Sequence, residues 1–268
     1  MNKNNSLGQI DAPIGFFDSG VGGLTVFSKV KKLLPSENYI YFGDTKNMPY
    51  GEKSPEVLVE LTKKAFDFFQ SKGAKAVVMA CNTTSAVAFD VVKDDYDFVI
   101  YPIIQSVAKL ISAQGLKRIG VFATPATINS HAYSKEIKEH TEDVEVFEIA
   151  CPEWVKIVEE NRLDCDESVK LVQAKLTEIK KFSPEKIVLG CTHYPYLLGI
   201  LSKLMPVEDF IDPSKDFAEF VKSDLKNKGL LNVKNNSGIE EFFVSTEPDK
   251  FQQSGRLFYE IEDLPKII

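Results

Sequence analysis

Short apolar runs alternate with amphipathic segments along almost the whole chain, and this alternation constrains the fold more than any other feature. The candidate strands are residues 14–17, 39–42, 76–79, 98–101, 118–122, 144–149 and 186–189. Continuous apolar runs of this length are typical of strands that are buried on both faces, as in a parallel sheet. Helical patterns lie between them, so the order of elements predicts an α/β fold.

The clearest helical pattern covers residues 54–72. Ser54 can cap its start, Pro55 suits the first turn, and Gly73 suits the stop. The apolar residues Val57, Leu61, Ala65 and Phe68 recur at helical spacing and predict the buried face. Residues 167–181 have the same character.

A weak internal repeat divides the chain into two similar halves. Residues 14–20 (IGFFDSG) resemble residues 119–125 (IGVFATP), and residues 77–83 (VVMACNT) resemble residues 187–193 (IVLGCTH). Each half therefore has a strand that ends at a hydroxyl residue and a later strand that ends in a cysteine, Cys81 or Cys191. Ligands of open α/β sheets bind at the carboxyl ends of strands, so both cysteines are placed where a ligand would lie.

Composition excludes several classes of function. The chain has 268 residues and a net charge of -7, which makes nucleic acid a poor partner. No apolar stretch approaches the roughly 20 residues that span a bilayer, so no membrane partner is expected. Residues 1–12 are polar and lack the apolar core of a signal peptide; we interpret them as a short disordered lead-in. We therefore expect a cytoplasmic protein with reduced thiols.

The two cysteines of the repeat differ from the other two in their neighbours along the chain. Cys81 precedes Asn82 and Thr83, and Cys191 precedes Thr192 and His193. Cys151 and Cys165 lack such residues and are assigned to structure, which is also the usual role of a lone buried thiol. A thiol at a strand-to-helix turn can meet helix amides, which favour the thiolate. Two such groups suit proton transfer at a stereocentre, where one takes a proton and the other supplies one.

Other motifs leave alternatives open. The loop 18–23 (DSGVGG) comes after a strand and partly matches a dinucleotide-binding loop, with Asp44 where a ribose-binding acid would stand, but Thr25 replaces the third glycine. A tight turn whose amides face a small carboxylate, or a plain strand-to-helix turn, explains it equally. His193 could relay protons or bond to backbone. A zinc site at Cys191 and His193 would need ligands that the sequence does not offer, so no metal is expected.

Taken together, these motifs resemble the bacterial glutamate racemase family. The matching segments are 17–25 (FDSGVGGLT), 44–45 (DT) with 49–51 (PYG), 80–84 (ACNTT) and 190–195 (GCTHYP), with weaker matches at 124–128 and 245–251. The resemblance covers nearly the whole chain from residue 14 onward. It implies two similar parallel-sheet α/β domains related by pseudo-twofold symmetry, with the active site between them. Residues 1–104 plus 217–268 would form the first domain, which carries Cys81. Residues 105–216 would form the second, which carries Cys191.

The resemblance also implies an activity and its residues. The family interconverts L- and D-glutamate without pyridoxal phosphate, other cofactor or metal, and D-glutamate serves peptidoglycan synthesis. Cys81 would deprotonate D-glutamate and Cys191 L-glutamate, assisted by Asp18, His193 and Glu159. The residues that would hold the substrate are Asp18, Ser19, Tyr50, Gly51, Asn82, Thr83, Thr127, Thr192 and His193. The expected partner is the small-molecule substrate, and a homodimer is compatible with the sequence.

The chain departs from the family pattern at three places. Residues 46–48 (KNM) stand where many members carry a basic residue shortly before the Pro-Tyr-Gly motif. Lys156 replaces the usual proline before Ile157, and Pro213 comes after Asp212 where serine is common. These changes affect the expected role of Glu159 and any contact between subunits more than the core chemistry.

Three other functions remain as alternatives. The first is a racemase for aspartate or another amino acid, because side-chain length cannot be read from the sequence. The second is a nucleotide-binding oxidoreductase that uses residues 20–23. The third is a non-catalytic binding protein, which no residue pattern supports.

Overall fold

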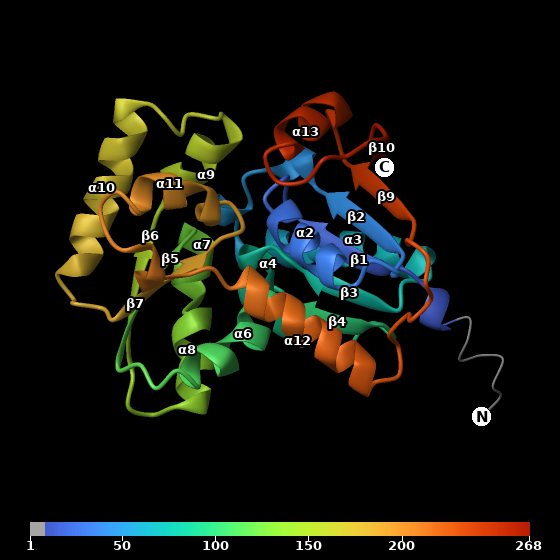
Figure 1. Cartoon of the computed structure of the whole chain (residues 1–268), viewed down its shortest axis with the longest axis horizontal. Coiled ribbons are helices and arrows are strands. Elements are labelled where there is room, and N and C mark those ends of the chain that lie inside the picture. Colours follow the sequence, from blue (N-terminus) through green and yellow to red (C-terminus); the bar gives the residue numbers. More distant parts are fainter. Residues whose placement is uncertain (1–8) are drawn as a thin grey trace.

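The computed structural model describes residues 9–268 and contains two parallel β-sheets with helices packed against them (Figure 1). The strands of the first sheet are β1 (Ile14–Asp18), β2 (Tyr39–Gly43), β3 (Ala76–Met79), β4 (Val99–Pro102), β9 (Glu240–Val244) and β10 (Lys266–Ile267). The strands of the second are β5 (Arg118–Ala123), β6 (Glu145–Ala150), β7 (Lys186–Gly190) and β8 (Phe210–Ile211). All strand pairs of the described residues are parallel, so the predicted α/β class is confirmed.

The two sheets repeat one strand order. The first sheet runs β10-β9-β2-β1-β3-β4 and the second runs β6-β5-β7-β8, so β2-β1-β3-β4 and β6-β5-β7-β8 correspond strand by strand. The strands that the sequence repeat matched, β1 with β5 and β3 with β7, are the two inner strands of this shared four-strand order. This shared order is what a pseudo-twofold relation between two similar halves requires. The last strands of the chain, β9 and β10, extend the first sheet beyond β2.

Helices fill the connections between the strands. They are α2 (Leu24–Leu33), α3 (Pro55–Ser71), α4 (Asn82–Val87), α5 (Phe89–Val92), α6 (Ile103–Ser112), α7 (Pro125–Ser130), α8 (Ala132–His140), α9 (Pro152–Glu159), α10 (Asp166–Lys180), α11 (Leu198–Leu201), α12 (Ser214–Asn227) and α13 (Pro248–Gly255). Short 3-10 turns are η1 (Thr45–Asn47), η2 (Tyr50–Glu52), η3 (Tyr194–Leu197) and η4 (Val207–Asp209). None of these described helices combines the length and apolar character that a membrane crossing needs.

The two sheets share a hydrophobic core. One continuous cluster of buried side chains includes Phe16 of β1, Ile104 of α6, Val121 of β5 and Phe217 of α12. In Figure 1, α6 and α12 lie at the junction of the two lobes, where α12 packs against both α2 and α6. This shared core therefore fixes the position of one sheet relative to the other.

The predicted helix at residues 54–72 exists, and of its predicted buried face only Ala65 is fully buried. The helix α3 begins after Ser54, and Gly73 lies just past its end with φ +67°, as the stop signal predicted. Its fully buried residues are Leu58, Thr62, Ala65, Phe66 and Phe69. Val57 is 40% exposed, whereas Leu61 and Phe68 are only partly buried. The apolar residues of α3 form two adjacent stripes along the helix. The buried stripe is the one that contains Leu58, Phe66 and Phe69.

The expected disorder of residues 1–12 is wrong for the part that the structure describes. Residues 1–8 lie outside the described residues, but residues 9–11 are helical. The Asp11 backbone carbonyl accepts a hydrogen bond from Asn38 Nδ2 at 2.8 Å, and the Asp11 carboxylate pairs with Lys234 at 2.5 Å. Tertiary contacts with distant segments therefore order a stretch whose own sequence carries no helix signal.

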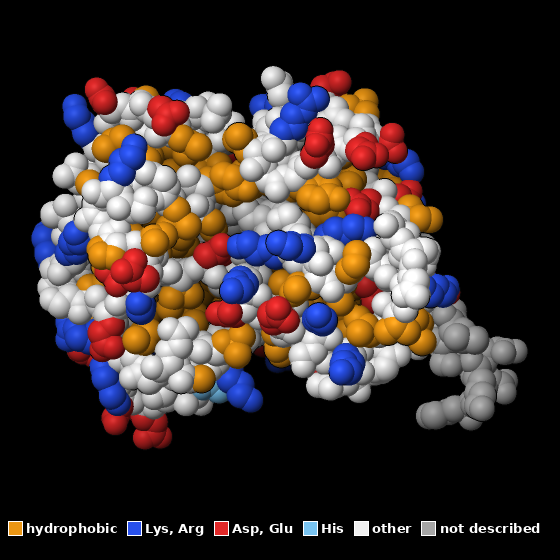
Figure 2. Space-filling model, in the orientation of Figure 1, with side chains coloured by type: hydrophobic (Ala, Val, Ile, Leu, Met, Phe, Trp, Pro, Cys, Tyr) orange, Lys and Arg blue, Asp and Glu red, His pale blue; other side chains and the backbone are white. Residues whose placement is uncertain are grey.

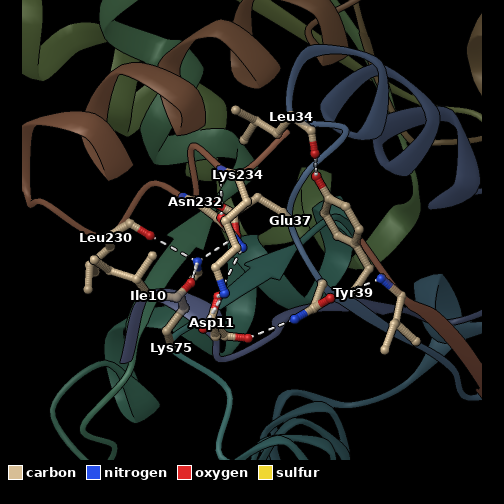
Figure 3. A network of polar contacts seen from close by, with 11 residues as sticks. Ile10, Asp11, Leu34, Glu37, Tyr39, Lys75, Leu230, Asn232 and Lys234 are labelled. Carbon is tan, nitrogen blue, oxygen red and sulfur yellow. Dashed lines mark hydrogen bonds and ion pairs between the residues drawn. The ribbon is translucent and has the colours of Figure 1, made fainter. Parts of the chain in front are cut away.

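A buried ion pair joins four chain segments at the amino ends of the first sheet's strands (Figure 3). Lys75 Nζ lies 2.5 Å from Glu37 Oε2, and both side chains are almost fully buried. The same ammonium donates to the carbonyl oxygens of Ile10 and Leu230, and Glu37 Oε1 accepts from the Asn232 backbone amide at 2.7 Å. Because every partner is supplied, the charges remain buried and fasten both terminal segments to the sheet.

The surface drawn in Figure 2 mixes both signs of charge. Lys and Arg side chains lie among acidic and apolar ones on this face, rather than forming one continuous basic field.

Substitution of Lys75 tests the contribution of this network to stability. Lys75→Met should lower the free energy of unfolding by about 3–5 kcal/mol, because it leaves the Glu37 carboxylate buried without its counter-ion. Urea denaturation followed by circular dichroism would measure the loss. Lys234→Met is the control: it removes the half-exposed pair with Asp11 and should cost less than about 1 kcal/mol. Equal losses in the two variants would contradict this account.

Candidate active site

One cavity lies where the carboxyl ends of the central strands of both sheets face each other. Its walls come from the loops after β1, β2, β3, β5, β6 and β7. The lining residues are Ser19, Met48, Pro49, Tyr50, Gly51, Glu52, Cys81, Asn82, Thr83, Thr124, Pro125, Pro152, Val155, Lys156, Cys191, Thr192 and His193. Both cysteines that the sequence repeat singled out therefore line the same space, one from each sheet.

Cys81 ends the first sheet's central strand β3 and stands at the start of α4. Backbone amides of Thr83 and Thr84 hydrogen-bond to its sulfur, as the strand-to-helix turn predicted. Burial, together with the smaller effect of the negative charge of Asp18, nevertheless raises the pKa of the Cys81 thiol to about 12. The amides lower this pKa, as expected, but burial outweighs them, so Cys81 rests as a thiol.

Asp18 lies directly behind the cavity wall at the end of β1. Its carboxylate accepts a hydrogen bond from the Gly20 amide at 3.0 Å and one from Thr192 Oγ1 at 3.3 Å. Burial raises the pKa of Asp18 to about 6, because desolvation outweighs the nearby charge of His193 and these hydrogen bonds. A buried carboxyl that titrates near neutral pH beside a thiol can exchange protons with it.

The second cysteine has a different neighbour. Cys191 Sγ lies 3.7 Å from His193 Nδ1, and His193 Nε2 lies 2.6 Å from Glu159 Oε1. Burial opposes the charged imidazole, but the hydrogen bonds to Cys191 and Glu159 outweigh it, so the pKa of His193 lies well above its usual value. The imidazole beside the sulfur can exchange a proton with it. The chain Cys191–His193–Glu159 thus has the form of an activated nucleophile or base held by a third group.

The glycine-rich loop of residues 18–23 packs against other parts of the protein and does not form an open anion-binding loop. A Cβ on Gly22 would lie 2.5 Å from His193 Nδ1 and Thr192 Oγ1, and one on Gly23 would lie 2.5 Å from Asp18 Cβ. Thr25 Oγ1 reaches across to the Thr192 carbonyl oxygen at 3.3 Å. The glycines therefore permit the close approach of the loop after β7, and no space for a pyrophosphate remains over them.

Asp44 is also occupied by protein partners. Its Oδ2 accepts a hydrogen bond from Tyr50 Oη at 2.5 Å, and both of its carboxylate oxygens accept from Asn47 Nδ2. A ribose-binding role would need these oxygens free. Asp44 instead fixes Tyr50, which lines the cavity together with Pro49 and Gly51, so the segment 47–51 forms a rim loop of the site.

A chain of hydroxyl groups crosses between the two sheets. Thr83 Oγ1 lies 2.8 Å from Thr124 Oγ1, which lies 3.0 Å from Thr127 Oγ1. Of these, Thr83 and Thr124 line the cavity, whereas Thr127 lies behind Thr124. Thr127 was predicted as a site residue and Thr124 was not. The signal was present, because the internal repeat aligns Thr124 with Ser19.

Most of the predicted site residues meet at this cavity. Those that line it are Cys81, Cys191, Ser19, Tyr50, Gly51, Asn82, Thr83, Thr192 and His193. Asp18, Thr127 and Glu159 lie one layer behind it, each in contact with a residue that does line it. Pro152, Val155 and Lys156 of α9 also line it and were not predicted, because apolar residues and a surface lysine carry no chemical signal in the sequence.

The remaining cysteines stand apart from this arrangement. All four cysteines are free, Cys151 is fully buried, and Cys165 caps the start of α10 through its sulfur. Within residues 9–268, no three His, Cys, Asp or Glu side chains gather in a way that could hold a metal ion.

Comparison with known proteins agrees on one family. A family model described as Asp/Glu/Hydantoin racemase matches residues 21–219. The chain is 42% identical over 245 residues to a glutamate racemase of Trichormus variabilis, covering 91% of this chain and 83% of the relative. It is 38% identical over 255 residues to one from Lactobacillus helveticus, covering 94% and 95%. Its structure resembles that of Francisella tularensis glutamate racemase in complex with D-glutamate, with a TM-score of 0.90, 33% identity, and coverage of 97% and 98%.

The raised pKa of Asp18 predicts a specific pH dependence of stability. Between about pH 3.8 and pH 6 the carboxyl of the unfolded chain ionises while the folded one stays protonated, so the folded state loses stability as the pH rises. The full loss is about 3 kcal/mol at roughly 1.4 kcal/mol per pKa unit. Asp18→Asn should therefore gain stability relative to the wild type through this window, as measured by urea unfolding at a series of pH values.

The control for this experiment is Asp97→Asn, at an exposed position. Its stability should track that of the wild type across the same range. A difference between Asp18→Asn and wild type that stays constant with pH would show that the Asp18 carboxyl titrates normally in the folded protein.

Proposed function

The chain belongs to the Asp/Glu/Hydantoin racemase family and is an amino-acid racemase, and we propose that it interconverts L- and D-glutamate through Cys81 and Cys191. The observation that carries the mechanism is the presence of both cysteines on one cavity, at equivalent strand ends of two repeated sheets. The relatives named above are glutamate racemases, and the matches cover 83% or more of each of them. This supports glutamate as the substrate.

The proposed reaction moves one proton at each face of the α-carbon. A thiolate takes the α-proton and becomes a thiol, and the electron pair of the broken C–H bond passes toward the α-carboxylate. The opposite thiol then gives its proton to the other face of the same carbon and becomes a thiolate. The product is the mirror image of the substrate, and the next turnover can run in the reverse direction.

The surroundings of the two sulfurs support a starting state for this reaction. His193 Nδ1 lies 3.7 Å from the Cys191 sulfur, and burial keeps Cys81 protonated. The resemblance to the family assigns Cys191 as the base for L-glutamate, and Cys81 would then be the acid that completes that turnover. Asp18, with its pKa near 6, and His193 would return protons to their neighbouring sulfurs, and Glu159 would hold the charge on His193.

The cavity offers polar groups for the rest of the substrate. Hydroxyl groups come from Ser19, Thr83, Thr124 and Thr192, and the amide comes from Asn82. Hydrogen bonds to the α-carboxylate are strongest when charge develops on it during proton removal, which lowers the barrier. We propose that these groups hold the two carboxylates, with Tyr50 and Gly51 closing the rim, and that no cofactor or metal takes part.

We also propose the division of the chain and its role in the cell. Residues 1–104 with 217–268, and residues 105–216, would act as two domains that meet at the cavity. The D-glutamate produced would supply peptidoglycan synthesis in the cytoplasm.

Isotope exchange tests the two-thiol mechanism. With L-glutamate in D₂O and no added cofactor, the optical rotation should fall to zero while deuterium enters at Cα, because each proton delivered comes from a solvent-exchanged thiol. Circular dichroism and proton NMR would measure the two quantities. Cys81→Ala and Cys191→Ala should each reduce racemisation below detection, and Cys165→Ala, at an uninvolved thiol, should retain it. Loss of rotation without deuterium gain would rule out the mechanism.

Complementation tests the role in the cell. The gene should restore growth of a bacterial strain that requires D-glutamate, whereas the Cys81→Ala and Cys191→Ala variants should not, because the strain needs the racemised product itself. Growth on plates with and without D-glutamate is the readout. Failure of an expressed, folded wild-type protein to rescue growth would contradict the assignment, and an amino-acid panel assayed by chiral chromatography would then identify the substrate.

A further inference from the structure

One buried hydrogen-bond donor of the cavity wall has no partner. Among the described residues, the buried side-chain nitrogens and oxygens without a hydrogen bond are Asn82 Nδ2, Glu148 Oε1, Trp154 Nε1 and Arg162 Nε. Of these four atoms, only Asn82 Nδ2 belongs to a residue that lines the cavity between the two cysteines. The residue is 3% exposed, and its amide nitrogen is buried without a hydrogen-bond partner among the described residues. An unmet buried donor costs about 1–3 kcal/mol, which a ligand oxygen would recover.

The other end of the same amide is held firmly. Asn82 Oδ1 accepts a hydrogen bond from Tyr133 Oη at 2.7 Å, and Tyr133 is fully buried. Asn82 is the first residue of α4, beside Cys81, whereas Tyr133 belongs to α8, which comes after β5 of the second sheet. The bond therefore passes from one sheet's half of the molecule to the other.

The direction of this hydrogen bond determines whether the free end of the Asn82 amide is a donor or an acceptor. If Tyr133 donates to Oδ1, the amide NH₂ is the end left without a partner, and a carboxylate in the cavity that Asn82 lines can accept from it. If the amide were reversed, its NH₂ would donate to the Tyr133 oxygen and the hydroxyl hydrogen would be buried without an acceptor. Burial also raises the pKa of Tyr133, so the hydroxyl keeps its proton and remains a donor. The first arrangement leaves a single unmet group, the NH₂ of a residue that lines the cavity.

Tyr133 is itself fixed by the strand that carries the other cysteine. A Cβ on Gly190 would lie 2.8 Å from the Tyr133 ring, so this glycine makes room for the ring immediately before Cys191. One side chain thus contacts the end of β7 at Cys191 and the start of α4 at Cys81. It sets the position of Asn82 relative to both sulfurs.

We propose that Tyr133 is a positioning residue that acts through Asn82: it orients the amide so that its NH₂ donates to an α-carboxylate oxygen of the substrate. The α-carboxylate is the relevant one because Asn82 adjoins Cys81, whose sulfur must reach Cα, one bond away from that group. Charge gathers on its oxygens when the α-proton leaves, so a donor held in place there acts mainly on the rate. This inference rests on the proposed racemase mechanism.

A double-mutant cycle tests the proposal. Tyr133→Phe removes only the hydroxyl and should lower kcat/KM for glutamate by about 10- to 100-fold, the usual range for a hydrogen bond to a charged group, with most of the loss in kcat. In an Asn82→Ala background, Tyr133→Phe should change kcat/KM less than about twofold, because its effect passes through Asn82. Tyr39→Phe is the matched control. It removes the 2.7 Å hydrogen bond from Tyr39 Oη to the Leu34 carbonyl oxygen, and the buried Tyr39 does not line the cavity. It should leave kcat/KM close to that of the wild type.

A measurement on the free protein keeps the test independent of the substrate. The side-chain amide of Asn82 should give one sharp pair of ¹H–¹⁵N signals, assigned by their loss in Asn82→Asp. In Tyr133→Phe these signals should shift and broaden as the amide gains freedom to turn, and in Tyr39→Phe they should not.

Each outcome decides one question. Unchanged Asn82 signals in Tyr133→Phe, or losses in kcat/KM that multiply independently in the double variant, would overturn the positioning role while leaving the racemase assignment intact. A wild-type protein without activity on glutamate would overturn the proposed substrate instead. The cycle would then be run on the amino acid that the substrate panel identifies.

Discussion

The close approach of two loops from different sheets is the constraint on which the site depends. The turn after β1 and the loop after β7 meet so closely that Gly22 cannot carry a Cβ without striking His193 and Thr192. At this contact Thr192 Oγ1 donates to Asp18, and Thr25 donates back to the Thr192 carbonyl. The same contact brings the strand ends of both sheets to one cavity. A sequence of glycines that resembles a nucleotide-binding loop is thus explained by the packing of protein against protein.

The repeat is symmetric in its strands but not in its chemistry. The position that holds Asp18 in the first half holds Ala123 in the second, and the position that holds His193 in the second half holds Thr83 in the first. In the proposed mechanism the first half supplies Asp18, and the second supplies His193 with Glu159, so the two sulfurs have titratable neighbours of different kinds. A racemisation has an equilibrium constant of one, so kcat/KM must be equal in the two directions at any pH. The asymmetry can change the protonation state of the free enzyme, and therefore kcat and KM separately. It cannot make the enzyme favour either isomer overall.

The sequence predicts those features that depend on local pattern and on the repeat. The central strands end within a residue of their predicted bounds, because they are apolar on both faces. Strands β8 and β10 were missed because each has two residues, and β9 because it opens with Glu240 and Glu241. The buried face of α3 was misjudged because Phe66, Phe68 and Phe69 allow two stripes. The high pKa of Cys81 and the contact of Tyr133 with Asn82 depend on burial between segments distant in sequence, which no local pattern records.

The two ends of the first sheet use buried polar groups in opposite ways. At the amino ends, Lys75 and Glu37 are buried with all their partners present, and the result is a fixed connection between chain segments. At the carboxyl ends, burial leaves Asp18 with a raised pKa, Cys81 as a thiol that resists ionisation, and Asn82 with an unpaired donor. These groups cost stability in the free protein. Under the proposed function, a bound amino acid brings an ammonium and carboxylates that match them, so the polar groups that the fold leaves unsatisfied would be the ones that select the ligand.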